Sequence, residues 1–140
     1  MNAYLDASAL FAFFTSDIHT PRVVRWVAVA HDRVLLSEWT LAEFSSALAV
    51  AQRMGRFTAD HRVGLELAVD TWLAPRRPPL PVIAGDGQAA RQLIRGLTRP
   101  LRAADALHLV ISRRLGCSLV TFDRGLRAVA ADLGIPVEDL

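Results

Sequence analysis

The sequence has 140 residues, of which 52% are hydrophobic and 21% are charged, and its formal net charge is +2. This composition predicts a globular chain and excludes a disordered one. All 16 basic residues are arginine, so no lysine is present for a P-loop, a Schiff base or a Ser-Lys dyad. The small net charge does not by itself predict nucleic-acid binding.

Cys117 is the only cysteine, which excludes an internal disulfide and a cysteine-based zinc site and suits a reducing compartment. No signal-like segment precedes Tyr4, and no apolar run reaches the roughly 18 to 20 residues of a membrane span. We therefore expect a cytoplasmic protein without membrane contact. The length predicts a single domain over residues 1–140. The proline-rich stretch 74–81 is interpreted as a loop and not as a domain boundary, because neither flanking segment could fold as an independent domain.

Short apolar runs alternate with stretches of helical spacing along the chain. Strands are expected at residues 4–5, 34–36, 81–83, 118–121 and 134–137. Helices are expected at about residues 9–14, 20–30, 37–54, 58–73, 86–97, 101–114 and 124–133, with Thr20 and Thr58 as N-caps. This alternation predicts an α/β fold with a parallel sheet covered on both faces.

Two acidic residues follow directly on predicted strands. Asp6 ends the run Tyr4-Leu5, and Asp123 follows the strand at 118–121. Crossovers between parallel strands are right-handed, so the C-terminal ends of these strands meet at one edge of the sheet. Ligands of open α/β sheets bind at that edge. We therefore expect both carboxylates to emerge on the same rim.

Two further acidic residues lie near the beginnings of helices. Glu43 is near the start of the helix after the second strand, and Asp105 is in the first turn or so of the apolar helix at 101–114. A charge isolated on such a helix is costly to bury unless something pairs with it. The remaining acidic residues are expected on solvent-facing surfaces.

Each of the four acids also has a purely structural interpretation. The two that follow strands could be N-caps of the next helix. Glu43 could close a capping box with Thr40, and Asp105 could pair with Arg102 or with the helix dipole. Four separate caps, however, have no reason to converge on one rim.

Convergent carboxylates repel one another, and at least one should stay protonated unless a cation neutralises the cluster. All-oxygen ligation suits Mg²⁺ or Mn²⁺, which bind through a few carboxylates, water and substrate phosphate oxygens. Such ions can activate water and stabilise the leaving oxygen in phosphodiester cleavage. The four acids therefore indicate metal-dependent hydrolysis of a phosphodiester.

Four blocks of the sequence occur in the order and approximate spacing of the PIN-domain nucleases. They are Leu5-Asp6-Ala7-Ser8-Ala9-Leu10, the Ala42-Glu43 helix, Ala104-Asp105-Ala106-Leu107-His108-Leu109 and Leu119-Val120-Thr121-Phe122-Asp123. The chain resembles a VapC-type toxin ribonuclease of a type II toxin–antitoxin pair from Tyr4 to about Val137. The resemblance implies a single PIN-like domain with a parallel five-stranded sheet of order 3-2-1-4-5.

The same resemblance implies the site. Asp6, Glu43, Asp105 and Asp123 would be the catalytic acids, with Mg²⁺, or alternatively Mn²⁺, bound chiefly through Asp6 and Asp105. The other two acids would complete the pocket directly or through water. The implied strand order would put the switch point between strands one and four, beside Asp6 and Asp123.

The resemblance also implies an activity and partners. Ser8 and Thr121 match positions that support the acids by hydrogen bonding, and the chain would be an endoribonuclease toxin inhibited by a small antitoxin. The apolar positions of the helices at 37–54 and 58–73 suit a partner or homodimer surface. The alternatives are a non-catalytic PIN-fold module that binds RNA or protein, and a housekeeping PIN nuclease.

Other chemistries are disfavoured by the residues present. An aspartyl-phosphate enzyme or receiver domain needs a supporting lysine, and a haloacid-dehalogenase-type phosphatase needs a second aspartate where Ser8 stands. His108 lies three residues after Asp105 and is interpreted as a packed or capping histidine rather than a base.

Overall fold

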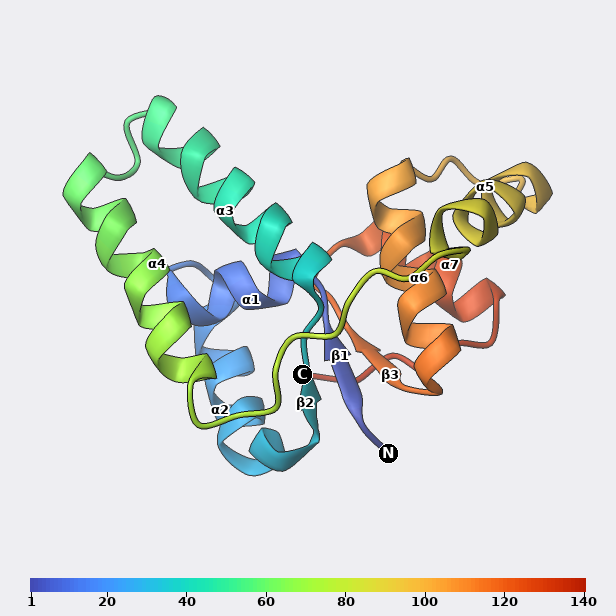
Figure 1. Ribbon diagram of the computed structural model, residues 1–140, viewed down its shortest axis with the longest axis horizontal. Coiled ribbons are helices and arrows are strands. Elements are labelled where there is room, and N and C mark those ends of the chain that lie inside the picture. Colours follow the sequence, from blue (N-terminus) through green and yellow to red (C-terminus); the bar gives the residue numbers. More distant parts are fainter.

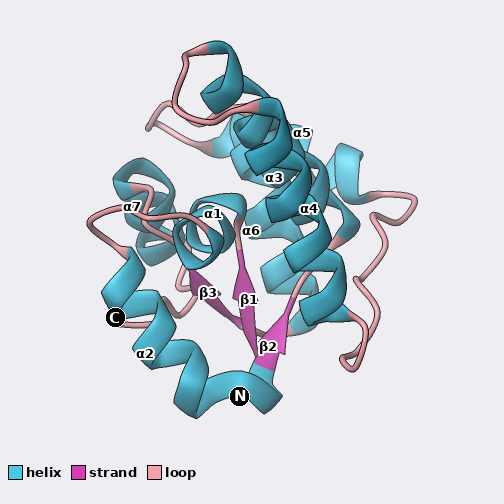
Figure 2. Cartoon of the chain, turned by 90° about the vertical axis from the view of Figure 1, so that its left-hand side faces the viewer, coloured by secondary structure: helices cyan, strands magenta, loops and turns pink.

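The computed structural model describes residues 1–140, and a small parallel sheet lies at its centre (Figure 2). Its strands are β1 (Ala3–Leu5), β2 (Val34–Leu35) and β3 (Ser118–Val120), in the order β2-β1-β3. In the register of the sheet, Tyr4 lies opposite both Leu35 and Leu119. The strands are short and flanked by helices, as expected for a parallel sheet that is buried on both faces.

The expected five-stranded sheet is wrong in its strand count, because the two outer segments form single bridges only. Leu80 bridges Ser37 beside β2, and Val137 bridges Leu119 beside β3. The spatial order of these segments agrees with 3-2-1-4-5, but Leu80 pairs in place of the expected strand at 81–83, and neither outer segment extends its ladder. Prolines flank Leu80 on both sides, and a proline precedes Val137. Because proline has no N–H to donate, pairing at both edges stops after one residue.

Seven α-helices and one 3₁₀-helix surround the sheet (Figure 1). They are α1 (Ala7–Phe14), α2 (Thr20–Ala30), η1 (His31–Arg33), α3 (Glu38–Arg53), α4 (Ala59–Leu73), α5 (Asp86–Gly96), α6 (Ala103–Leu115) and α7 (Arg124–Asp132). The observed helix ends lie within two residues of the expected ones. None of these helices has both the length and the apolar character that crossing a membrane requires.

The helices form two arms on either side of the C-terminal end of β1 (Figure 1). The α3–α4 hairpin is one arm, and α5 with the start of α6 is the other. A long connection after α4 crosses between them. The acidic residues expected at the sheet edge therefore lie where the arms meet.

Because successive side chains of β1 point to opposite faces of the sheet, they contribute to two separate parts of the hydrophobic core. Leu5 packs with Leu10, Phe44 and Leu48 of α1 and α3. Tyr4 points to the other face, in the core cluster that α6, β3 and α7 form. Successive strand residues face opposite sides, so Tyr4 and the residue two positions later share a direction. That later residue is Asp6.

In four helices the N-cap residue uses its side chain to cap the helix, and this cap fixes the residue at which the helix begins. The N-caps Asp6, Ser37, Thr58 and Asp123 each accept a hydrogen bond from the backbone N–H three residues later. Thr20, expected as an N-cap, is instead the first helical residue of α2, and its hydroxyl donates to the carbonyl of Ala12 at 2.7 Å. Local capping thus positions two of the four candidate acids.

Candidate active site

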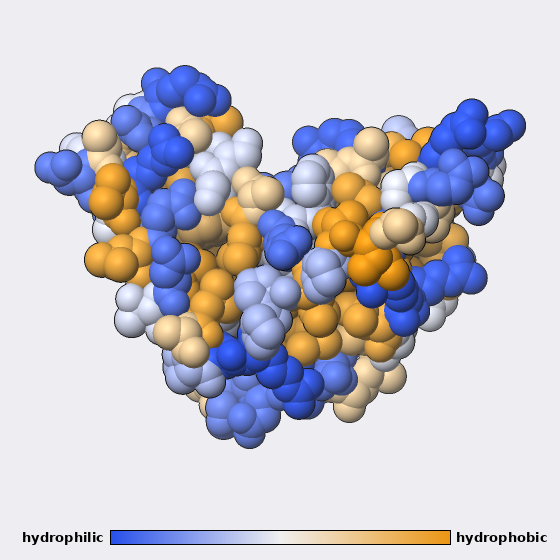
Figure 3. Space-filling model, viewed as in Figure 1, coloured by the Kyte–Doolittle hydropathy of each residue, from blue (hydrophilic) through white to orange (hydrophobic).

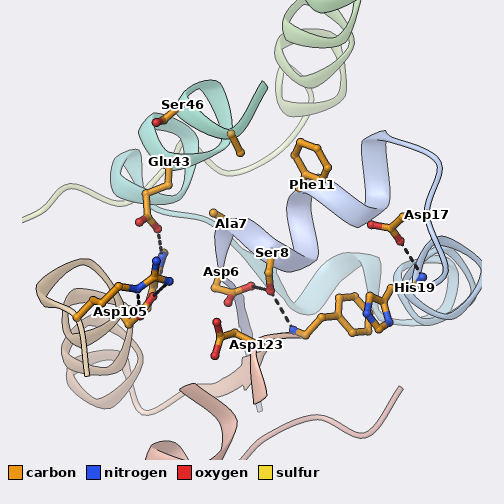
Figure 4. A pocket seen from close by; sticks show the side chains of 14 residues that line it. Asp6, Ala7, Ser8, Phe11, Asp17, His19, Glu43, Ser46, Asp105 and Asp123 are labelled. Atoms are coloured by element: carbon orange, nitrogen blue, oxygen red, sulfur yellow. Dashed lines mark hydrogen bonds and ion pairs between the residues drawn. The ribbon is translucent and has the colours of Figure 1, made fainter. Parts of the chain in front are cut away.

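One cavity of about 550 Å³ gathers all four acids predicted from the sequence (Figure 4). Asp6 follows β1 and Asp123 follows β3, whereas Glu43 comes from α3 and Asp105 from the first turn of α6. Figure 3 shows the surface hollowed between the two arms that carry these helices. Elements separated by up to 117 positions in the sequence, from Asp6 to Asp123, therefore line the same space.

Asp6 is the most buried of the four acids, at 3% exposure. Its Oδ1 accepts hydrogen bonds from the Ser8 hydroxyl at 2.8 Å and the Ala9 N–H at 2.9 Å, and its Oδ2 accepts one from the Thr121 hydroxyl at 2.6 Å. Burial raises the pKa of Asp6 above its ordinary value, although the charge of His108 and these hydrogen bonds oppose the rise. Both hydroxyls that were expected to support the site thus contact this carboxylate.

Asp123 is held by the turn that links β3 to α7. Its N–H donates to the Thr121 hydroxyl at 3.0 Å, and its Oδ1 accepts from the Leu126 N–H at 2.8 Å. A Cβ added at Gly125 would lie 3.2 Å from that oxygen, so the turn closes tightly on the carboxylate. The capping interpretation is correct for Asp123 and for Asp6, and both caps also face the cavity.

Glu43 lies on the opposite wall, with its side chain 25% exposed. Its carboxylate contacts Nε2 of His108, which is buried and belongs to α6. The capping-box interpretation is wrong, because Ser37 is the N-cap of α3 and Thr40 occupies the third helical position. Glu43 is therefore free of any capping role and joins α3 to α6.

Asp105 pairs with Arg102, whose Nε lies 2.9 Å from Oδ2 of the carboxylate. The side chain of Arg102 is 78% exposed and that of Asp105 is 16% exposed. The hydrogen bond and charge of Asp105 raise the pKa of Arg102, with smaller contributions from the charges of Asp123 and Glu43. One guanidinium at the cavity mouth therefore balances part of the acidic charge.

The fit of a divalent ion depends on how far these acids converge. No group of three or more His, Cys, Asp or Glu side chains lies close enough to hold a metal ion unaided. Mg²⁺, however, is commonly bound through one or two carboxylates, with waters and substrate phosphates as its other ligands. The cavity lining supplies carboxylate oxygens and no sulfur, and hard oxygen donors of this kind fit that chemistry.

The structure adds residues that the sequence interpretation did not assign to the cavity. His19 stacks on Phe122 with ring centroids 4.2 Å apart, and both line the wall near Asp17. Arg22 lies over the Phe122 ring at 5.5 Å. These residues come from two distant segments, so no local sequence pattern links them.

A second acidic residue is buried, contrary to the expectation that the acids other than the four candidates lie on solvent-facing surfaces. Asp86 is 3% exposed and forms a bidentate pair with Arg114, with N–O distances of 3.1 and 3.0 Å. Its Oδ2 also accepts the N–H of Ile83 at 3.0 Å. Asp86 lies outside the cavity and ties the start of α5 to α6.

A PIN domain family model matches residues 3–132, and the chain belongs to the PIN domain family. The expected family is therefore confirmed. A comparison with curated proteins gives no match.

Solved structures show the same fold. VapC20 from Mycobacterium tuberculosis, described as a sarcin-ricin loop cleaving toxin, is 22% identical, with a TM-score of 0.71 over 91% of this chain and 94% of that one. FitAcB from Neisseria gonorrhoeae is 19% identical, with a TM-score of 0.73 over 98% and 96% of the two chains. PAE2754 from Pyrobaculum aerophilum is 22% identical, with a TM-score of 0.67 over 92% and 86%.

Proposed function

We propose that this chain is a divalent-metal-dependent endoribonuclease. The observation that carries the proposal is a buried aspartate, Asp6, in one cavity with Glu43, Asp105 and Asp123 at the C-terminal edge of a parallel sheet. Clustered negative charge has no use in a groove that only binds phosphate, but it suits a cation that is shared with a phosphodiester. Membership of the PIN domain family supports the same reaction class.

In this proposal Asp6 and Asp105 are the principal ligands of Mg²⁺, or of Mn²⁺, and Glu43 and Asp123 complete the site directly or through water. When bound, the ion supplies activation of water and neutralisation of charge on the reacting phosphate. The protein side chains fix the carboxylates in place. Ser8 and Thr121 do so for Asp6, since each donates a hydrogen bond to a different oxygen.

Arg102 has a separate role at the mouth of the cavity. Its guanidinium offers several donors and is 78% exposed, so it can contact an RNA phosphate while remaining near Asp105. The stacked His19 and Phe122 rings line the same cavity on the side away from Asp105 (Figure 4). These features favour a polyanionic substrate over a small metabolite.

We further propose that the nuclease acts as the toxin of a toxin–antitoxin pair. The fold likeness to VapC20 supports this assignment. Exposed apolar side chains on the α3–α4 hairpin are suited to an antitoxin or to a second copy of the chain. They are Val50, Met54, Val63 and Leu67, with exposures of 42%, 80%, 66% and 64%.

The activity is tested by incubating the purified protein with labelled RNA in Mg²⁺, in Mn²⁺ and in excess chelator. Cleavage is expected only with a divalent ion, and Asp6→Asn should abolish it, whereas Asp32→Asn, which changes an exposed acid, should not. RNA affinity that is the same with metal and with chelator, without cleavage, would instead support a binding module.

The toxin assignment needs a test in cells. Expression of the chain should arrest growth, and co-expression with the cognate antitoxin that the proposal requires should restore growth. Metal-dependent cleavage in vitro without growth arrest would support a housekeeping nuclease.

A further inference from the structure

His108 connects the core of the sheet to an acid at the cavity rim. It is 1% exposed, and both ring nitrogens have partners: Nδ1 lies 2.8 Å from the Tyr4 hydroxyl, and Nε2 contacts Glu43. We propose that His108 is a positioning residue that holds the Glu43 carboxylate at a fixed position relative to Asp6. This inference rests on the proposed nuclease function.

The donors and acceptors of this network follow from its chemistry. An ionised carboxylate only accepts, so Nε2 of His108 carries the proton that it donates to Glu43. Nδ1 of the same ring lies 2.8 Å from the Tyr4 hydroxyl, which in turn lies 2.7 Å from the Ser37 hydroxyl. Burial raises the pKa of Tyr4 above its usual range, so the phenol keeps its proton and remains a donor.

The network begins at the strand that also presents Asp6. Tyr4 is fully buried in the middle of β1. Asp6 follows two residues later, so its side chain points to the same face of the sheet as that of Tyr4. A rigid path therefore runs from β1 through the Tyr4 hydroxyl and the His108 ring to Glu43. The arm that carries Glu43 is placed relative to Asp6 by this path.

Without His108, Glu43 would have little to hold it. Its side chain has several rotatable bonds, is 25% exposed, and has no other side-chain hydrogen bond. His108 belongs to α6, and Glu43 to α3, which lie in opposite arms in Figure 1. Partners of this kind, which orient a metal-site carboxylate, change affinity or activity about 10- to 100-fold when they are removed.

Two substitutions separate positioning from simple packing. In His108→Gln the amide can reproduce the Nε2 donor and retain the contact with Glu43. In His108→Asn the shorter amide can reproduce only the Nδ1 position facing Tyr4. Both variants replace a buried ring by a smaller amide, so thermal unfolding should show similar losses of stability for the two.

The test measures Mn²⁺ affinity by calorimetry and kcat for RNA cleavage, in the full chain. We expect His108→Asn to lose about 10- to 100-fold in both, and His108→Gln to stay within about threefold of the wild type. His31→Gln, at a histidine exposed on η1, is the control and should match the wild type.

Equal losses in the Gln and Asn variants would overturn the positioning role, as would full activity in both. If both variants unfold, Tyr4→Phe replaces them, because it removes only the hydroxyl that orients the ring. An unchanged Mn²⁺ affinity and kcat in Tyr4→Phe would then contradict the inference. A wild type that binds no Mn²⁺ and cuts no RNA would refute the nuclease proposal itself, which is a different outcome.

Discussion

The hydroxyl of Thr121 donates a 2.6 Å hydrogen bond to Oδ2 of Asp6, across 115 positions in the sequence. The same hydroxyl accepts the N–H of Asp123 at 3.0 Å. Thr121 thus links the two acids that follow neighbouring parallel strands.

Replacing Thr121 by valine should weaken both the fold and the activity. The substitution keeps the shape of the side chain but leaves a buried carboxylate oxygen without its donor, at a cost of about 1.5–3 kcal/mol in the free energy of unfolding. We expect kcat for RNA cleavage to fall about tenfold. Urea unfolding and initial-rate kinetics measure the two effects, and Thr121→Ser, which keeps the hydroxyl, should retain most of both.

Asp6 should make the stability of the metal-free protein depend on pH. Its folded pKa is raised above the ordinary value of 3.8, so between the two values the folded state binds more protons than the unfolded state. The stabilising contribution is complete below about pH 3.8 and is lost as the pH rises through the folded value.

Asp6→Asn removes this titration. We therefore expect the Tm of the variant to exceed that of the wild type at pH 8 by roughly 3 °C per kcal/mol relieved, with a smaller gap at pH 4. Differential scanning calorimetry in chelator provides the measurement. A gap that widens toward acid would contradict the assigned direction.

Divalent ions should stabilise the wild type at neutral pH. An ion present at 100 times its Kd adds about 2.7 kcal/mol to the free energy of unfolding, which corresponds to a Tm increase of roughly 5–10 °C. The increase should be absent in Asp6→Asn and intact in the surface control Asp32→Asn. An equal increase in all three proteins would place the ion elsewhere.

Arg102→Ala should separate metal binding from RNA binding. Removing the guanidinium leaves Asp105 unpaired, so we expect tighter binding of Mn²⁺, whereas RNA affinity should fall about three- to tenfold. The slope of log affinity against log salt should also decrease by about 0.7. Fluorescence anisotropy in the Asp6→Asn background measures RNA affinity without cleavage. Arg25→Ala, an exposed change on α2, serves as the control.

The helices could be predicted because their signals are local, whereas the strand order was implied only by the resemblance to the PIN-domain nucleases. Apolar periodicity gives each helix, and caps such as Ser37 and Thr58 fix where helices begin. The strand count could not be predicted in the same way. Val82 and Ile83 have the composition of a strand, but the prolines around Leu80 remove the donors that a ladder needs.

The candidate acids could also be predicted, whereas their partners could not. The sequence itself shows that Asp6 and Asp123 each follow a predicted strand. The path from Tyr4 through His108 to Glu43 joins residues 104 and 65 positions apart, so only the fold brings them together. The pair of Asp86 with Arg114 was missed for the same reason, since burial of a paired charge leaves no local pattern.

The central claim is that the acid-lined cavity cuts RNA by means of a divalent ion held through Asp6. Single-turnover cleavage of a labelled RNA by the wild type and by Asp6→Asn, each in Mg²⁺ and in chelator, tests it most directly. We predict cleavage by the wild type in Mg²⁺ alone and a rate for Asp6→Asn lower by about 10³-fold or more, as loss of several kcal/mol of transition-state stabilisation requires. Cleavage by folded Asp6→Asn at the wild-type rate would contradict the account.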